Sequence, residues 1–139
     1  MADAVAAAFG PDARGAMIEI AAPDVPAPAV ASFARRVRAV GARVGVAAPR
    51  ASHPPFDGAG APLDFVTVDA RGDVRALAEL ALASVIAPEA VAEGVVDRER
   101  ARWLARHGAT ALRGEGLAAP LRLRELVRWA SDRRSSLGL

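Results

Sequence analysis

The chain contains no cysteine, no lysine and no tyrosine, and aromatic residues make up only 4% of its 139 residues. The lack of cysteine excludes disulfides, thiolate nucleophiles and cysteine-ligated zinc. The two histidines, His53 and His107, have no second histidine at metal-ligand spacing, so we expect both to face solvent. Ser52, His53 and Asp57 resemble a catalytic triad in composition only, because no motif surrounds them.

A long uninterrupted apolar run is also missing. The longest candidate, residues 77–96, is broken by three glutamates and a proline, which excludes a membrane span. The first nine residues carry an aspartate and no basic segment, so we expect no secretory signal. These absences favour a cytoplasmic protein.

All 18 cationic residues are arginines. The very high pKa of arginine therefore brings the sequence pI to about 10.8, although the formal net charge is only +2. Two clusters could meet nucleic acid or an acidic partner: Arg35, Arg36, Arg38 and Arg43, and Arg122, Arg124, Arg128, Arg133 and Arg134. Because no nucleic-acid-binding motif accompanies them, we expect solvated outer faces and keep arginine-mediated nucleic-acid binding as an alternative.

Apolar periodicity predicts strands alternating with helices in one domain, which indicates βα units and a parallel sheet. The predicted strands are 16–21, 43–48, 63–69, 90–95 and 109–113. The predicted helices are 2–9, about 30–40, 73–86, 97–107 and 121–132, with Asp97 as a cap and Gly41 and Gly108 as C-terminal stops. Residues 1–15 are expected to form an N-terminal helix and turn, 49–62 a loop, and 133–139 a flexible tail.

Five segments around these strands carry a recognisable pattern: MIEIAA (17–22), GARVGVAA (41–48), DFVTVD (64–69), VAEGVV (91–96), and LRGEG (112–116) followed by Pro120-Leu121. In this order they resemble LEITE, G-x-R-x-x-I-D-D, DYLKID, VAEGVE and QGYLFSRPL of the EAL-domain family. Working members of that family hydrolyse cyclic-di-GMP with two metal ions inside a TIM-type barrel. The resemblance covers residues 2–121 and implies a truncated, degenerate member comprising the C-terminal half only.

The resemblance implies a small set of vestigial ligand-binding positions: Glu19, Asp69, Glu93 and Arg113, with the arginine standing in place of a glutamine. Other family positions are lost: Ala22, Ala47, Ala48, Thr67 and Val96 stand where the family has acidic residues or, at 67, a lysine. Glu19 and Glu93 are expected either to be solvated or to pair with Arg113. The alternative is that they still hold one cation.

Paired divalent metals need hard oxygen ligands from several directions, and the alanines at 47 and 48 supply none. We therefore predict no phosphodiesterase activity, no metal and no cofactor. The preferred hypothesis is a non-catalytic, EAL-derived regulatory or protein-interaction module in bacterial signalling. Open alternatives are a non-hydrolysing cyclic-di-GMP receptor and a half-enzyme completed by another polypeptide, which the Ala47-Ala48 pair disfavours.

The implied fold class is α/β: a partial TIM-type (β/α) barrel of about five parallel strands, which is too few to close. Helices should cover the face that bears Ile18, Ile20, Val66 and Val68. The opposite face is predicted to be open and to show Met17, Glu19, Gly45, Ala47, Phe65, Thr67, Val91, Glu93, Ala111 and Arg113. Because open faces and edges invite association, we expect a second copy or a different protein to cover it.

Overall fold

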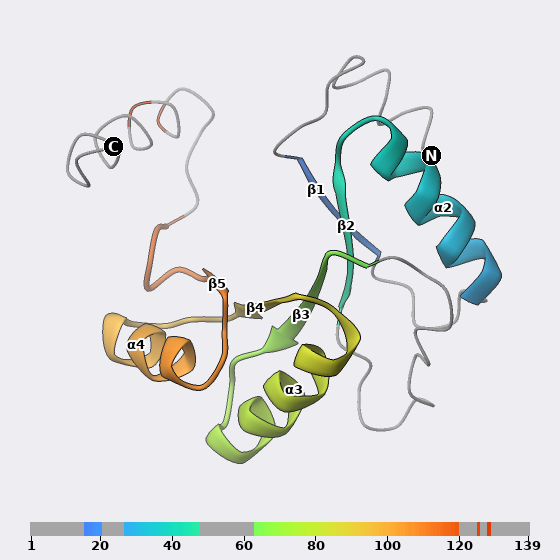
Figure 1. Ribbon diagram of the computed structural model, residues 1–139. Coiled ribbons are helices and arrows are strands. Elements are labelled where there is room, and N and C mark those ends of the chain that lie inside the picture. Colours follow the sequence, from blue (N-terminus) through green and yellow to red (C-terminus); the bar gives the residue numbers. More distant parts are fainter. Residues whose placement is uncertain (1–15, 21–26, 48–62, 120–124, 126–127, 129–139) are drawn as a thin grey trace.

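The computed structural model describes residues 16–20, 27–47, 63–119, 125 and 128. Its strands are β1 (Met17–Ile20), β2 (Arg43–Ala47), β3 (Phe65–Asp69), β4 (Glu89–Glu93) and β5 (Ala111–Arg113). Its helices are α2 (Ala27–Ala39), α3 (Asp73–Ile86) and α4 (Arg98–Arg106). Figure 1 shows the strands in sequence order, each neighbouring the next, with α2 beside β2 and α3 beside β3 and β4.

The strands form one open sheet in the order β1-β2-β3-β4-β5, and every pair is parallel. Each step from one parallel strand to the next needs a crossover connection. Helix α2 lies in the connection from β1 to β2, α3 in that from β3 to β4, and α4 in that from β4 to β5. The predicted α/β class, with five parallel strands in an open sheet, is confirmed. Strands β1 and β5 form the two edges of this sheet.

Local sequence signals set several element ends as predicted. Helix α3 covers 73–86, and Asp97 caps α4 by accepting a hydrogen bond from the Arg100 amide (2.6 Å). Gly41 and Gly108 follow helices with φ of 86° and 103°, in the left-handed region where glycine costs least. The predicted segments 2–9, 49–62 and 133–139, and most of 121–132, lie outside the described residues.

Strands β3, β4 and β5 each differ from the prediction by two residues at one end, and side chains explain two of these differences. Asp64 directly precedes β3: its carboxylate accepts the Val44 amide (2.9 Å), and its own amide donates to the Val44 carbonyl (2.7 Å). Thr110 precedes β5, and its hydroxyl oxygen accepts the Ala90 amide (2.9 Å). Strand β4 ends two residues early, where Gly94 turns the chain with φ of 76°.

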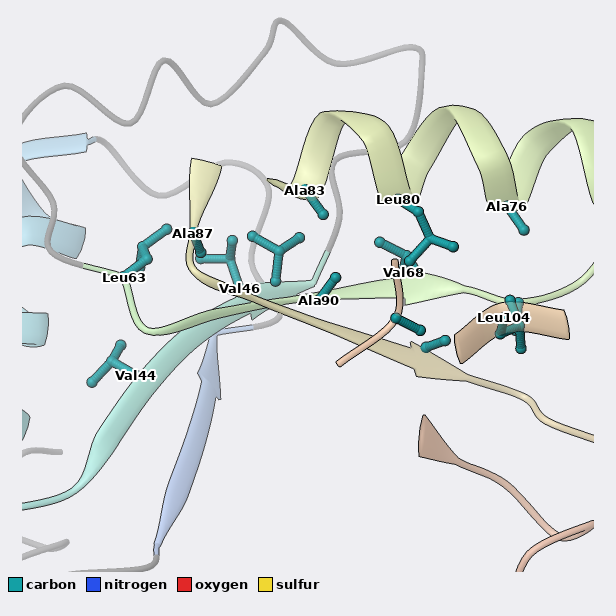
Figure 2. Packing of buried hydrophobic residues seen from close by; sticks show 14 of the residues in the cluster. Val44, Val46, Leu63, Val68, Ala76, Leu80, Ala83, Ala87, Ala90 and Leu104 are labelled. Carbon is teal, nitrogen blue, oxygen red and sulfur yellow. The ribbon is translucent and has the colours of Figure 1, made fainter. Parts of the chain in front are cut away.

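The core lies between the helices and one face of the sheet. Figure 2 shows Ala76, Leu80 and Ala83 of α3 directed toward the strands. The strands contribute every second residue because side chains alternate between faces; these are Val44, Val46, Val66, Val68, Ala90 and Ala92. Ile18 and Ile20 pack against this cluster, so the predicted helix-covered face is confirmed.

The opposite face of the sheet, here called the inner face, is not open throughout, which corrects the prediction. Its centre is buried: Phe65 and Thr67 are each 2% exposed, Val91 is 6% exposed, and Gly45 is buried. A Cβ on Gly45 would come closer than 3.0 Å to the Phe65 ring, so the ring lies directly over this glycine. Met17, Ala47 and Arg113 at the margins are exposed. The exposed part of the inner face is therefore its rim.

None of the helices in the described ranges is long and apolar enough to cross a membrane.

Candidate functional site

The candidate site lies where the strands end, on the rim of the inner face. In a parallel sheet the carboxyl ends of all strands meet at one edge, and here Asp69, Glu93 and Arg113 lie in register on β3, β4 and β5. Glu19 on β1 and Thr67 on β3 share this face, because side chains alternate along each strand and the register of β2 links the two strands. Four of these five side chains are the positions predicted from sequence.

Arg113 on β5 joins two carboxylates, one from the neighbouring strand β4 and one from the far edge strand β1. Its Nη2 donates to Glu93 Oε2 and lies 3.5 Å from Glu19 Oε2, although β1 and β5 are the two edge strands. The hydrogen bond that Arg113 donates to Glu93, with a further contribution from the Glu19 charge, raises the pKa of the Arg113 guanidinium. Arg113 therefore stays cationic and neutralises part of the charge of both glutamates. The predicted pairing of Glu19 and Glu93 with Arg113 is present.

Thr67 supplies the second contact to Glu19. Its hydroxyl donates to Glu19 Oε2 at 2.5 Å, and the residue is 2% exposed. A buried hydroxyl must find a hydrogen-bond partner, and a carboxylate is a strong acceptor. Glu19 is thus held by Thr67 from the buried centre and by Arg113 from the rim, which fixes its carboxylate orientation.

Asp69 is engaged by a residue that was not predicted from the sequence, Arg71. The Arg71 amide donates to Asp69 Oδ1 (3.0 Å), and its guanidinium donates to both carboxylate oxygens at 2.8–3.2 Å. The signal was local: an aspartate side chain that bonds the amide two residues on is a common turn, and an arginine in that second position can add a fork of donors. The hydrogen bond from Arg71 lowers the pKa of Asp69 to about 2.

This shift predicts an acid dependence of stability. The pKa of Asp69 falls from 3.8 to about 2, so its ionised form stabilises the folded state above pH 3.8. That contribution should be lost as the pH falls through 2, because the unfolded chain takes up the proton first. We expect the Asp69 carboxyl carbon to titrate near pH 2 by NMR, and to move toward 3.8 in Arg71→Ala. A normal titration in the unmodified protein would contradict the Asp69–Arg71 pair.

The other end of the inner face is also closed by an ion pair. Arg43 on β2 donates to Glu89 on β4, and its second nitrogen lies 3.0 Å from the Met17 sulfur. The inner face is therefore layered, with charged pairs at both ends and an apolar centre of Phe65 and Val91 between them. Such layering is typical of a barrel interior, where side chains from alternate strands share one level.

The side chains that the structure describes at the rim do not fit a pair of divalent metals. Within the described part of the chain, no three side chains among histidine, aspartate and glutamate gather closely enough to hold one ion. Ala47 ends β2 with an exposed methyl group, and Val96 lies beyond β4 and is 70% exposed. Ala22 and Ala48 fall outside the described residues. The carboxylates at the rim form ion pairs with arginines: Asp69 with Arg71, and Glu19 and Glu93 with Arg113.

No family model matches the sequence, and no curated protein matches it. Similarity is found among solved structures. The PaMucR phosphodiesterase in complex with c-di-GMP superposes with a TM-score of 0.72 at 19% identity, over 90% of this chain and 63% of that one. An EAL domain protein from Listeria monocytogenes EGD-e gives 0.65 at 18% identity, over 83% of this chain and 51% of its own.

This chain therefore spans about half to two thirds of the length of those structures. At such identities the likeness concerns architecture, in which parallel strands alternate with helices and direct their carboxyl ends to one rim. The chain has an EAL-like fold, laid out as an open, partial barrel.

Proposed function

We propose that this chain is a non-catalytic regulatory and protein-interaction module derived from an EAL domain, acting in bacterial signalling in the cytoplasm. The observation that carries the proposal is the placement of Arg113, whose guanidinium joins Glu19 and Glu93 at the rim. A guanidinium in this position provides the positive charge that a divalent cation would otherwise contribute. The EAL-like fold of the chain supports the signalling context.

The chemistry of phosphodiester hydrolysis supports the same conclusion. Two-metal hydrolysis requires ions that generate a hydroxide at neutral pH and stabilise the developing negative charge. Mg²⁺ in particular demands near-octahedral oxygen ligands. Glu19, Glu93 and Asp69 are each paired with an arginine, and Ala47 offers no oxygen at the end of β2. An enzyme with this arrangement would have to break ion pairs before it could bind its metals.

A second candidate function is binding of cyclic-di-GMP without hydrolysis. It is favoured by the exposure of two guanidiniums at the rim, where the side chains of Arg71 and Arg113 are 81% and 55% exposed. Guanidiniums recognise phosphates through paired hydrogen bonds. The PaMucR structure contains c-di-GMP. Both arginines already pair with carboxylates, so a nucleotide would have to compete with these internal partners.

Two assays on the full chain separate these functions. Incubated with cyclic-di-GMP and Mg²⁺ or Mn²⁺, the protein should leave the nucleotide intact in a chromatographic assay, because its carboxylates are occupied. Calorimetry should show no micromolar binding if the interaction module is correct. Binding that is lost in Arg113→Gln but kept in Arg102→Gln, an exposed arginine of α4, would instead establish the receptor. Metal-dependent hydrolysis would contradict both functions.

A further inference from the structure

Helix α3 carries two apolar stripes on opposite sides. One stripe packs on the sheet through Ala76, Leu80 and Ala83. The second, here called the outer stripe, faces solvent and consists of Val74, Leu77, Ala78, Ala81, Leu82 and Val85. Val74 and Val85 are each 84% exposed, and Leu77 and Leu82 are 38% and 43% exposed. Scattered exposed apolar residues are ordinary, but six on one helix face form a patch.

The spacing places these six residues together. At about 100° per residue they fall within roughly 140° of the helix circumference, centred opposite the buried stripe. The outer stripe bears no charge. The nearest charged pair, Arg75 and Glu79, is joined by a 2.7 Å ion pair along the border between the two stripes. A partner on the outer stripe would therefore not have to desolvate an unpaired charge.

The outer stripe reads the same from either end. Valine stands at positions 74 and 85, leucine at 77 and 82, and alanine at 78 and 81, so equal residues are equidistant from the midpoint of the stripe. Two crossing helices approach most closely at their crossing point and diverge toward their ends. Alanines at the centre permit that approach, and the larger residues at the ends fill the widening space.

We propose that the outer stripe of α3 is a self-association surface, on which the α3 helix of a second copy packs antiparallel about a twofold axis at residues 78–81. A twofold axis brings residue i onto residue j and j onto i, so here it forms layers of alanine on alanine and valine on valine. The antiparallel direction also opposes the two helix dipoles favourably. This surface lies on the opposite side of α3 from the sheet and does not depend on the rim site.

The size of the outer stripe predicts a weak dimer. Its exposed side chains would bury on the order of 1,000 Å² in total, at the lower limit for specific interfaces. We therefore expect a dissociation constant on the order of 10–100 μM. Such an equilibrium would respond to local concentration, for example when two copies are recruited to one assembly.

Sedimentation of the full chain across this concentration range tests the proposal. The unmodified protein should shift from monomer to dimer, and Ala81→Glu should weaken association at least tenfold by burying a carboxylate in the interface. Ala105→Glu, the same change on the exposed side of α4, should have no effect. A monomer at all concentrations, or a dimer that Ala81→Glu leaves intact, would overturn the proposal and would exclude this stripe as the interface.

The absence of cysteine allows a direct test of direction. In an antiparallel pair position 74 meets position 85 of the second copy, whereas the two copies of position 74 lie about 16 Å apart, too far for a disulfide. An oxidised mixture of Val74→Cys and Val85→Cys should therefore crosslink, and each variant alone should not. Crosslinking of the single variants with themselves would overturn the antiparallel arrangement.

Discussion

Gly114→Ala should destabilise the protein by about 3 kcal/mol, at the upper end of what one added methyl group costs in a packed site. A Cβ at this position would lie closer than 3.0 Å to the backbone nitrogen, carbon and oxygen of Val95. The segment around Val95 and the segment 113–116 are held against each other at this point, here called the crossing. The Val95 amide donates to the Arg113 carbonyl (3.2 Å), and the Gly116 amide donates to the Val95 carbonyl (2.9 Å). Neither backbone can move without losing these hydrogen bonds.

Urea unfolding of Gly114→Ala and Gly108→Ala provides the measurement and its control. Gly108 follows α4 with a positive φ of 103°, but an added Cβ there would meet nothing within 4 Å, so alanine costs only backbone strain, about 1 kcal/mol. Equal losses in the two variants would show that the crossing is not tight. The site should respond as well, because Gly114 directly follows Arg113 and the crossing fixes the backbone from which that guanidinium reaches Glu19 and Glu93.

Leu104→Ala should cost about 3 kcal/mol of unfolding free energy, since it removes a large, fully buried side chain and leaves a cavity. Leu104 is 0% exposed and belongs to the core cluster between α4 and the sheet. Arg100 also anchors the helix, by donating to the Ala70 carbonyl (2.6–3.0 Å) and pairing with Asp73 (2.5 Å). Loss of the Leu104 side chain therefore weakens the attachment of α4 as a whole.

Leu82→Ala is the matched control for this prediction. Leu82 is 43% exposed on α3, so the same chemical change should cost less than about 1 kcal/mol. Both variants are compared by urea unfolding at low micromolar concentration, where the proposed dimer is dissociated. A loss at Leu104 no larger than that at Leu82 would mean that α4 contributes little to the folded state.

Local patterns were enough to predict the order and type of the elements that the structure describes. Asp97 predicts the start of α4 because an aspartate side chain satisfies a free amide of the first turn. The apolar periodicity of 73–86 predicts α3, and alternation in 65–69 predicts which side chains meet the helices. The segments resembling EAL strands predicted the parallel order, and the likeness to EAL structures agrees with it.

The sequence analysis grouped Glu19, Asp69, Glu93 and Arg113 and paired the two glutamates with Arg113, but it did not identify the contacts made by Thr67 and Arg71. Glu19 and Arg113 are 94 positions apart, and only the curvature of the sheet brings the edge strands close enough for them to meet. Asp69 was placed in the same group, yet Arg71 engages its carboxylate two residues away. Arg71 can reach the Asp69 carboxylate only because of the geometry of the turn after β3. The residue types alone do not determine that geometry.

Residue identity alone fixes the chemistry that is available: no thiols, arginine as the sole strong cation, and a methyl group at Ala47 where the resembling family has a carboxylate. It also fixes the alternation of strands and helices, because periodicity is a local property. The packing of distant segments is needed to place the Phe65 ring over Gly45 and to bring Arg113 between Glu19 and Glu93. Burial and ion pairing depend on which residues distant in sequence come into contact, and those contacts form only when the strands assemble into the sheet.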